Sequence, residues 1–345
     1  MFTRFKKLFI TLSIGLMGAL AAQFAGLPAP AIIGATLTVS CASLLRVTQD
    51  IPDFCKNIGF TVIGCSLGSS ITPETLANTA KWPASITILG IAVIAIIYFC
   101  GKILVKFFNE SNETAILATS PGALAYVLSL AADGKGDIRS IAVIQTIRLV
   151  AVITTIPFLL THLGMHPAQS PGASTGSMGF LAFSAIFVSS LVLGWLFTRI
   201  KIPAAFFLAG VCISGIAHLS GIVIGRPADE IIFLGFTITG SLVGARFSTI
   251  PIADLKNLFW GSIAALLLSM FIAALFAAAV SQLLSLPFGQ VFVAFAPGGV
   301  EAMAAMAISL NYDPAYVAVH HLFRIFFLIL ILPLFLRTSN RLKRN

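Results

Sequence analysis

"PGALAYVLSLAADGKGDIRSIAVIQTIRL" (residues 121–149) and "PGGVEAMAAMAISLNYDPAYVAVHHLFRI" (residues 297–325) are two versions of one pattern. The second version follows the first at a distance of 176 residues and aligns with it without a gap. Proline, glycine, aspartate and arginine recur at matching positions: Pro121 and Pro297, Gly122 and Gly298, Asp137 and Asp313, Arg148 and Arg324, Pro157 and Pro333. Because four residue types keep one register, we predict an internal duplication of the chain.

The composition is that of a membrane protein. The chain has 345 residues, of which 58% are hydrophobic and 10% charged, with a mean hydropathy of +1.01. Globular chains carry about 25% charged residues. Runs of about 20 apolar residues recur along the whole length, as in transmembrane helices. The net charge of +9 comes from basic residues scattered between these runs, which is typical of cytoplasmic loops and does not indicate direct nucleic-acid binding.

The two predicted repeats are separated by a stretch rich in proline, glycine and serine. This stretch, residues 162–176, reads "HLGMHPAQSPGASTG", with six apolar segments before it and six after it. We therefore predict a first membrane repeat over 1–161 and a second over 177–345. "GCSLGSS" (64–70) and "GSLVGAR" (240–246) also align, and their spaced glycines favour close helix contacts.

The distribution of lysine and arginine predicts how the repeats cross the membrane. If all twelve apolar segments cross, 12 basic residues lie inside and 7 outside. If the segments near 114–132 and 289–310 enter and return on the same side, 17 lie inside and 2 outside. The second arrangement agrees better with the positive-inside rule. It predicts an all-α membrane protein of two inverted repeats, each with about five transmembrane helices and one re-entrant hairpin, and with both termini cytoplasmic.

The Pro-Gly pairs are expected to interrupt a helix inside each hairpin. Proline fits the first position of the restarting helix, where its missing N–H would be unpaired anyway. Such a helix start presents free backbone amides and the positive end of a dipole. We expect Ser120, Pro121, Gly122, Pro297, Gly298 and Gly299 to line a substrate site. The alternative is a proline-kinked helix that crosses the membrane.

Arg148 and Arg324 each follow an aspartate by 11 residues, which is about 16 Å along a helix and half the hydrocarbon thickness. A charge at that depth costs at least about 2.5–3.5 kcal/mol. We weigh two roles for the arginines, an anion-binding pair or structural groups bonded to the carbonyl ends of the broken helices. Gln145 and His321, three residues earlier on the same helix face, join them as substrate-site candidates.

Three carboxylates are candidates for ion coupling. Glu301 follows Pro297 by four residues, where a carboxylate is favoured by the helix dipole or serves as a proton or cation site. Asp137 and Asp313 stand at predicted helix starts, and Asp313-Pro314 is a strong start signal. We expect no metal site or cofactor, because His320 and His321 point to different faces of a helix.

"SPGALAYVLSLAADGKGDIRSIAVIQTIRL" and "APGGVEAMAAMAISLNYDPAYVAVHHLFRI" resemble the two motif copies of the AbrB family of duplicated bacterial membrane proteins. The resemblance covers essentially the whole chain. Family members carry the labels ammonia monooxygenase and regulator, neither of which implies a mechanism. The family pattern is closer to Ser-Pro-Gly-Gly, from which Ala123 and Ala296 depart. The architecture is also similar to that of 2-hydroxycarboxylate and glutamate symporters, which is an analogy of fold.

These features predict a secondary transporter, not an enzyme, in the bacterial inner membrane. It would carry a small, anionic organic solute coupled to a proton or a sodium ion. The expected partners are this solute and membrane lipid, and a homodimer is left open. The alternatives are a membrane sensor or regulator that acts indirectly on gene expression, or a membrane monooxygenase component. The last would need a metal-ligand set that the sequence does not present.

Overall fold

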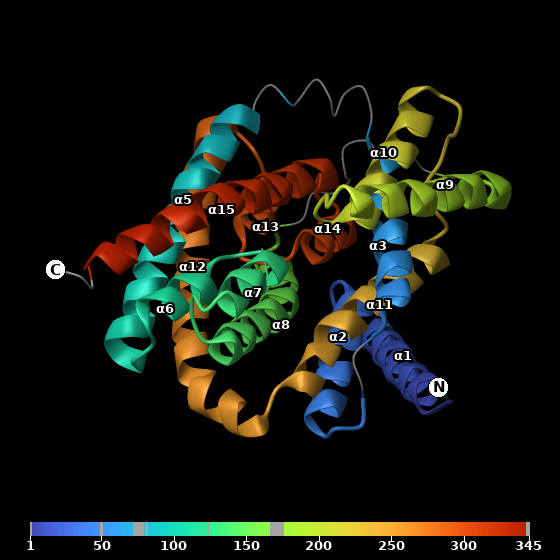
Figure 1. Ribbon diagram of the computed structural model, residues 1–345. Helices are drawn as coiled ribbons and strands as arrows, with labels where there is room; N and C mark the ends of the chain where they lie inside the picture. The colour runs from blue at the N-terminus through green and yellow to red at the C-terminus, as the bar shows by residue number, and fades with distance from the viewer. Residues whose placement is uncertain are drawn as a thin grey trace. The chain divides into compact units, whose positions relative to one another are not determined.

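The computed structural model describes residues 2–48, 51–71, 79, 82–122, 124–165 and 176–342 (Figure 1). In this part of the chain the regular structure is helical, apart from one isolated bridge between Ser177 and Arg226. The elements are α1 (Phe2–Phe24), α2 (Pro30–Leu44), α3 (Asp53–Gly68), α5 (Trp82–Phe108), α6 (Asn112–Thr119), α7 (Leu124–Ala132), α8 (Ile138–His162), α9 (Phe180–Arg199), α10 (Ala205–Leu219), α11 (Asp229–Ala245), the 3-10 turn η2 (Arg246–Thr249), α12 (Ile252–Leu284), α13 (Phe288–Phe295), α14 (Val300–Ser309) and α15 (Pro314–Leu342). The predicted all-α class is confirmed.

Seven of the described helices, α1, α5, α8, α9, α11 (with η2), α12 and α15, are long and apolar enough to cross a membrane. The chain is therefore a multi-pass membrane protein. We expected ten crossings. Three of the apolar segments that were expected to cross, those near 28–45, 57–71 and 202–222, form helices α2, α3 and α10 of only 15, 16 and 15 residues. At 1.5 Å per residue these helices are about 22–24 Å long, shorter than a hydrocarbon core of about 30 Å.

Both Pro-Gly pairs fall between two short helices. Helix α6 ends at Thr119 and α7 begins at Leu124, while α13 ends at Phe295 and α14 begins at Val300. A long helix follows each pair, and each long helix contains one internal proline, Pro157 in α8 and Pro333 in α15. The backbone leaves helical geometry at each Pro-Gly pair, so neither segment is one continuous kinked helix.

The chain divides into two compact units that both draw on both halves of the sequence. Unit 1 contains residues 1–82, 153–249 and 300–318, and unit 2 contains residues 83–152, 250–299 and 319–345. Because each unit takes segments from before and after the predicted linker, spatial neighbours are often far apart in sequence. Most of that linker, residues 166–175, lies outside the described residues.

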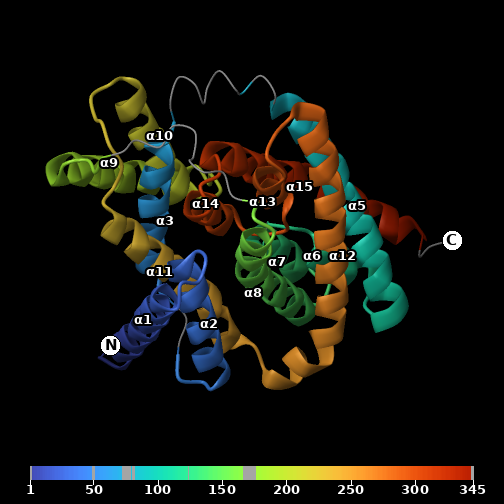
Figure 2. The ribbon, with the colours of Figure 1, turned by 180° about the vertical axis from the view of Figure 1, so that it is seen from behind.

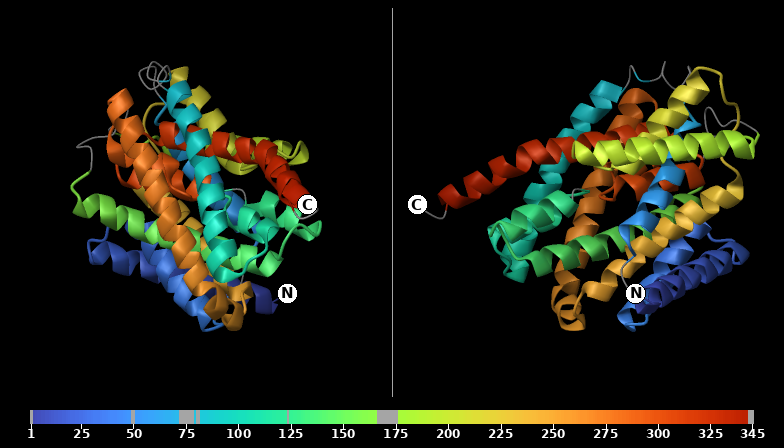
Figure 3. Two further views of the ribbon diagram at one scale, coloured as in Figure 1. Left: turned by 90° about the vertical axis from the view of Figure 1, so that its left-hand side faces the viewer. Right: turned by 45° about the vertical axis from the view of Figure 1, so that its right-hand side comes forward.

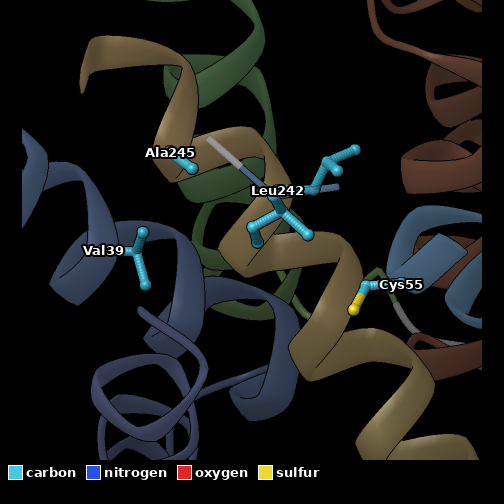
Figure 4. Close-up of a cluster of buried hydrophobic side chains, with 5 residues drawn as sticks. Val39, Cys55, Leu242 and Ala245 are labelled. Atoms are coloured by element: carbon cyan, nitrogen blue, oxygen red, sulfur yellow. The ribbon is translucent and has the colours of Figure 1, made fainter. Parts of the chain in front are cut away.

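Unit 1 contains two groups of three helices. In each group two helices come from one half of the sequence and the third comes from the other half, so that one helix is exchanged between the halves. Helices α1 and α2 pack together and take α11 as their third helix, whereas α9 and α10 take α3 (Figures 1 and 2). Helices α3 and α11 also pack on each other and link the groups. A cluster of buried apolar residues at one of these contacts includes Val39 of α2, Cys55 of α3, and Leu242 and Ala245 of α11 (Figure 4).

Glycines allow the exchanged helices to approach closely. A Cβ atom added at Gly64 of α3 would lie 2.2 Å from the carbonyl oxygen of Phe207 in α10. A Cβ atom added at Gly240 of α11 would lie 2.5 Å from the carbonyl oxygen of Ile32 in α2. Both distances are shorter than any real contact, so a larger residue would force the helices apart. The predicted small-residue contacts are confirmed.

Helices α3 and α11 make one contact twice with the roles exchanged. A Cβ atom at Gly59 would lie 2.9 Å from Cγ2 of Ile238, and one at Gly235 would lie 2.6 Å from Cγ1 of Val62. Gly59 and Val62 precede Gly235 and Ile238 by the same 176 residues that relate the two motif copies. The contact is therefore reciprocal, because each helix places a glycine against an aliphatic side chain of the other.

Unit 2 is built on two long helices, α5 and α12, which run side by side (Figure 3). The Cys100 thiol of α5 donates a hydrogen bond to the carbonyl of Ala265 in α12, at 3.5 Å. Helix α13 packs on α12, and α6 packs on α7. The unit thereby contains both Pro-Gly pairs and the parts of α8 and α15 that carry the two arginines.

Candidate functional site

Unit 2 contains every residue that the sequence assigned to the substrate site. The first half of the chain contributes Ser120, Pro121, Gly122, Gln145 and Arg148, and the second half contributes Pro297, Gly298, Gly299, His321 and Arg324. The candidate coupling residues Glu301 and Asp313 belong to unit 1, and Asp137 belongs to unit 2.

Arg148 binds the carbonyl end of helix α6. Its side chain is buried, with 5% of the residue surface exposed. The guanidinium group donates to the carbonyl oxygens of three consecutive residues, Ala118 (3.2 Å), Thr119 (3.2 Å) and Ser120 (3.0 Å). One turn earlier, the Gln145 side-chain amide donates to the carbonyl of Leu117 at 3.0 Å. Because the last carbonyls of a helix lack helical N–H partners, these bonds satisfy groups that the chain break would leave unpaired. We call Gln145 and Arg148 the first clamp.

Arg324 and His321 bind the end of α13 in the same way. Arg324 is 1% exposed, and its Nη1 donates to the carbonyl of Ala296 at 2.6 Å. Its Nη2 contacts the carbonyl oxygen of Gly298 and Nδ1 of His321, each at 2.5 Å. The Nε2 atom of His321 lies 3.0 Å from the carbonyl of Val293. We call His321 and Arg324 the second clamp.

The two clamps share two bonds between residues at matching positions. Gln145 bonds Leu117 and His321 bonds Val293, and in both cases the partner lies 28 residues earlier. Arg148 bonds Ser120 and Arg324 bonds Ala296, again 28 residues earlier. Of the two roles weighed for the arginines, bonding to carbonyl ends of broken helices therefore describes their contacts in this structure.

The two Pro-Gly pairs adjoin each other through Arg324. Gly122 has a φ angle of +89°, which favours glycine over residues with a Cβ atom. A Cβ atom there would lie 2.8 Å from Nη2 of Arg324 and 3.1 Å from the carbonyl oxygen of Gly298. Sequence reasoning missed this contact, since the Pro-Gly pair indicates a turn but not the partner of the turn.

Both arginines keep one buried donor without a partner. The Nε atoms of Arg148 and Arg324 are buried and have no hydrogen-bond acceptor among the described residues. The ion pairs found in that part of the chain, Lys56 with Asp53 and Arg226 with Asp229, involve other residues. The clamp arginines thus combine full burial, positive charge and a free N–H group each.

The Ser120 side chain bonds within the helix that precedes the Pro-Gly pair. Its hydroxyl donates to the carbonyl of Ile116 in α6, at 2.7 Å. Ser120 is the C-cap residue of α6, and Arg148 binds its carbonyl, so its contacts are those of a helix end.

Asp137 and Asp313 cap the long helices that carry the arginines. Asp137 accepts from the backbone N–H of Ser140 at 2.9 Å, and Asp313 accepts from that of Ala315 at 2.9 Å. Partial burial acts to raise the pKa of Asp137, but the bonds from Ser140 and Arg139 outweigh it and lower this pKa below its usual value. Capping accounts for both aspartates, and their role in ion coupling stays a prediction.

Glu301 occupies the first turn of α14, where the helix dipole favours a carboxylate. The charges of Arg246 and Lys56, also in unit 1, act on it. Its role in coupling also stays a prediction. His320 lies 2.8 Å from the Ser85 hydroxyl on α5, so the adjacent histidines face different elements, as predicted. Among the described residues, no three histidine, cysteine or carboxylate side chains are grouped as metal ligands.

The fold and the site define a class: a multi-pass, all-helical membrane protein with two interrupted helices held by buried arginines. The chain belongs to the AbrB family, because the family model described as "Transition state regulatory protein AbrB" matches residues 31–339. It is 22% identical over 360 residues to "Uncharacterized protein YhjN" of Bacillus subtilis (strain 168), covering 96% of this chain and 92% of that protein. It is also 22% identical over 321 residues to "Putative regulator AbrB" of Escherichia coli (strain K12), covering 89% of each.

Proposed function

We propose that this protein is a secondary transporter of a small organic anion with a single negative charge. The observation that carries the proposal is the pair of buried arginines in unit 2, neither of which meets a carboxylate among the described residues. A buried, uncompensated cation is costly, by at least about 2.5–3.5 kcal/mol in a membrane helix. A bound anion would offset that cost for both arginines.

The charge of the clamps supports one negative charge on the ligand. The two guanidinium groups contribute two positive charges. The C-terminal ends of α6 and α13, which the arginines bind, each act as about −0.5 of a charge. The remainder is about one positive charge, which a monocarboxylate would neutralise. The two free Nε–H groups supply donors, and charge-assisted bonds to a carboxylate are about twice as strong as neutral ones.

Helix directions in unit 1 support the inverted repeats. Gly64 and Gly68 of α3 meet Phe207 and Ser214 of α10 in that order, so α3 and α10 run in the same direction. Helices α2 and α3 are joined by residues 45–52 and must run in opposite directions if both enter the membrane. Helix α10 therefore runs opposite to α2, its counterpart in the first repeat. We propose two inverted copies, each with one re-entrant hairpin (α6–α7 and α13–α14).

The inverted arrangement predicts opposite sides for two matched loops. Lys135 precedes α8 and Asn311 precedes α15, and the two positions are 176 residues apart. In a variant with serine at the exposed Cys41 and Cys212, single cysteines at Lys135 and Asn311 should be labelled from opposite faces. Lys135→Cys should react only from the cytoplasm and Asn311→Cys only from the periplasm. Reaction of both from one face would exclude inversion.

The transport proposal predicts a ligand profile. For the purified protein in detergent, acetate and lactate should raise the melting temperature more than succinate, and choline should leave it unchanged. A ligand at 100 times its Kd stabilises by about 2.7 kcal/mol. In proteoliposomes, uptake of the same monocarboxylates should respond to an imposed proton or sodium gradient. Stabilisation by choline but by no anion would refute the anion site.

A membrane sensor is the second candidate, because one relative is named as a regulator. A sensor would bind the anion through the same clamps and show no flux in proteoliposomes. We propose the bacterial inner membrane as the location, with both termini in the cytoplasm, on the basis of the distribution of basic residues.

A further inference from the structure

The neighbours of His321 determine which of its ring nitrogens carries hydrogen. Arg324 has only donor groups, so Nδ1 of His321 must accept the bond from Nη2 with a lone pair. The Val293 carbonyl has only acceptor capacity, so Nε2 must carry the hydrogen and donate. The geometry of the second clamp therefore requires a neutral imidazole.

A proton on Nδ1 is incompatible with this geometry. The added N–H would face the N–H of Arg324, and two positive groups would meet in a fully buried place. Among the described residues that act on the imidazole, Arg324 and His320 on its own helix oppose a positive charge, and the carbonyl of Val293 in α13 favours it. Arg148 of α8 adds a further positive charge that acts on Arg324. Protonation must break the bond between His321 and Arg324.

Loss of the bond between His321 and Arg324 would change the contacts of both Pro-Gly pairs. The same Nη2 atom that binds His321 also binds the carbonyl of Gly298. It lies 2.8 Å from the position that a Cβ atom of Gly122 would occupy. A shift of this one nitrogen changes the contacts of both segments. The first clamp lacks this sensitivity, because Gln145 occupies the position that corresponds to His321 and does not titrate.

We infer that His321 is the proton-accepting residue that couples this protein to a proton gradient, through its bond to Arg324. The inference rests on the proposed anion transport and selects the proton over sodium. An anion beside Arg324 offsets the charge of a protonated His321, so each ligand strengthens binding of the other. Reciprocal strengthening is the requirement for symport. His321 acts here as a positioning residue, since it moves Arg324.

The experiment exchanges the two clamp residues. Melting temperatures of detergent-purified protein without added ligand are compared at pH 8.0 and pH 5.5. The native contacts need neutral His321, and a free histidine titrates near pH 6.5, so the wild type should lose stability on acidification. Between pH 8.0 and pH 5.5, the melting temperature of His321→Gln should fall less than that of the wild type, and that of Gln145→His should fall more. The double exchange, Gln145→His with His321→Gln, places the histidine in the first clamp beside Arg148. It should restore the loss of stability at acidic pH. An unchanged acid sensitivity in His321→Gln would overturn the inference.

Binding of acetate gives a second readout. In the wild type, acetate binding is linked to the uptake of one proton, so the acetate affinity should rise by up to about tenfold for each unit by which the pH is lowered. Calorimetry in two buffers of different ionisation enthalpy measures the number of protons taken up when acetate binds. This uptake should be seen in His320→Gln and should be absent in His321→Gln. An uptake that persists in His321→Gln would also overturn the inference. A further outcome is that acetate binds neither the wild type nor any variant, while the exchange of Gln145 and His321 still changes the loss of stability at acidic pH. In that case the protonation of His321 is supported and the proposed anion transport is refuted.

Discussion

Alanine at Arg148 or Arg324 is expected to abolish anion binding and to lower the stability of the protein. Each replacement removes a buried cation. Arg148→Ala also takes the side-chain donor from the carbonyls of Ala118, Thr119 and Ser120. Arg324→Ala takes it from the carbonyl of Gly298 and from that of Ala296, which keeps the N–H of Gly298 as a donor. An unsatisfied buried group costs about 1–3 kcal/mol. The measurement is acetate affinity and melting temperature of purified variants. We expect a loss of both for each arginine.

Lysine separates the charge from the shape of the guanidinium group. Arg148→Lys and Arg324→Lys keep the positive charge, but an ammonium group cannot span the carbonyls that the planar fork reaches. We therefore expect the lysine variants to bind acetate almost as poorly as the alanine variants and to melt at similarly low temperatures. Arg226→Ala is the matched control, because Arg226 pairs with Asp229 on the surface, with side chains 44% and 74% exposed. Such exposed pairs contribute about 0–1 kcal/mol.

One outcome would reassign the arginines. If both alanine variants, compared with the wild type at matched melting temperature, bind acetate with unchanged affinity, the arginines only hold the ends of α6 and α13. The proposed charge of the substrate would then lose its basis. Transport as such would remain open, because the interrupted helices do not depend on that result.

Alanine at Gly122 is expected to have the second large effect. The φ angle of +89° is unfavourable for alanine, and the new methyl group would lie 2.8 Å from Nη2 and 3.0 Å from Nε of Arg324. Arg324 or the Pro-Gly segment has to move. We expect a loss of about 1–3 kcal/mol from the backbone and a further loss from the displaced clamp. Melting temperature and acetate affinity should both fall.

Gly134 supplies the control for Gly122. Its φ angle is +81°, close to that of Gly122, but a Cβ atom there would meet nothing within 4 Å. Gly134→Ala therefore carries the backbone strain without the steric contact. The difference between the two variants measures the contact between the Pro-Gly segments. Equal effects of both substitutions on stability and on acetate affinity would contradict a functional contact at Gly122.

The sequence by itself determined the membrane class, the helical breaks and the common register of the two motifs. Apolar runs of sufficient length can satisfy their backbone only as helices, so composition was enough for the class. Pro121 and Pro297 cannot continue a helix that needs their N–H, so the breaks were local properties. The capping aspartates are equally local, since each bonds N–H groups two or three residues away. The equal spacing of Arg148 and Arg324 identified them as a pair before any contact was known.

Only the tertiary structure decided what the arginines bind. Their carbonyl partners lie 26 to 30 residues earlier in the chain, and the sequence allowed either an anion or a carbonyl end. The exchange of α3 and α11 between the helix groups was likewise invisible, because Gly64 and Gly240 indicate a close neighbour without identifying it. The same holds for Gly122 and Arg324, whose contact joins opposite halves of the chain. Packing chooses among partners that are equally acceptable locally, and that choice depends on where distant segments come to lie.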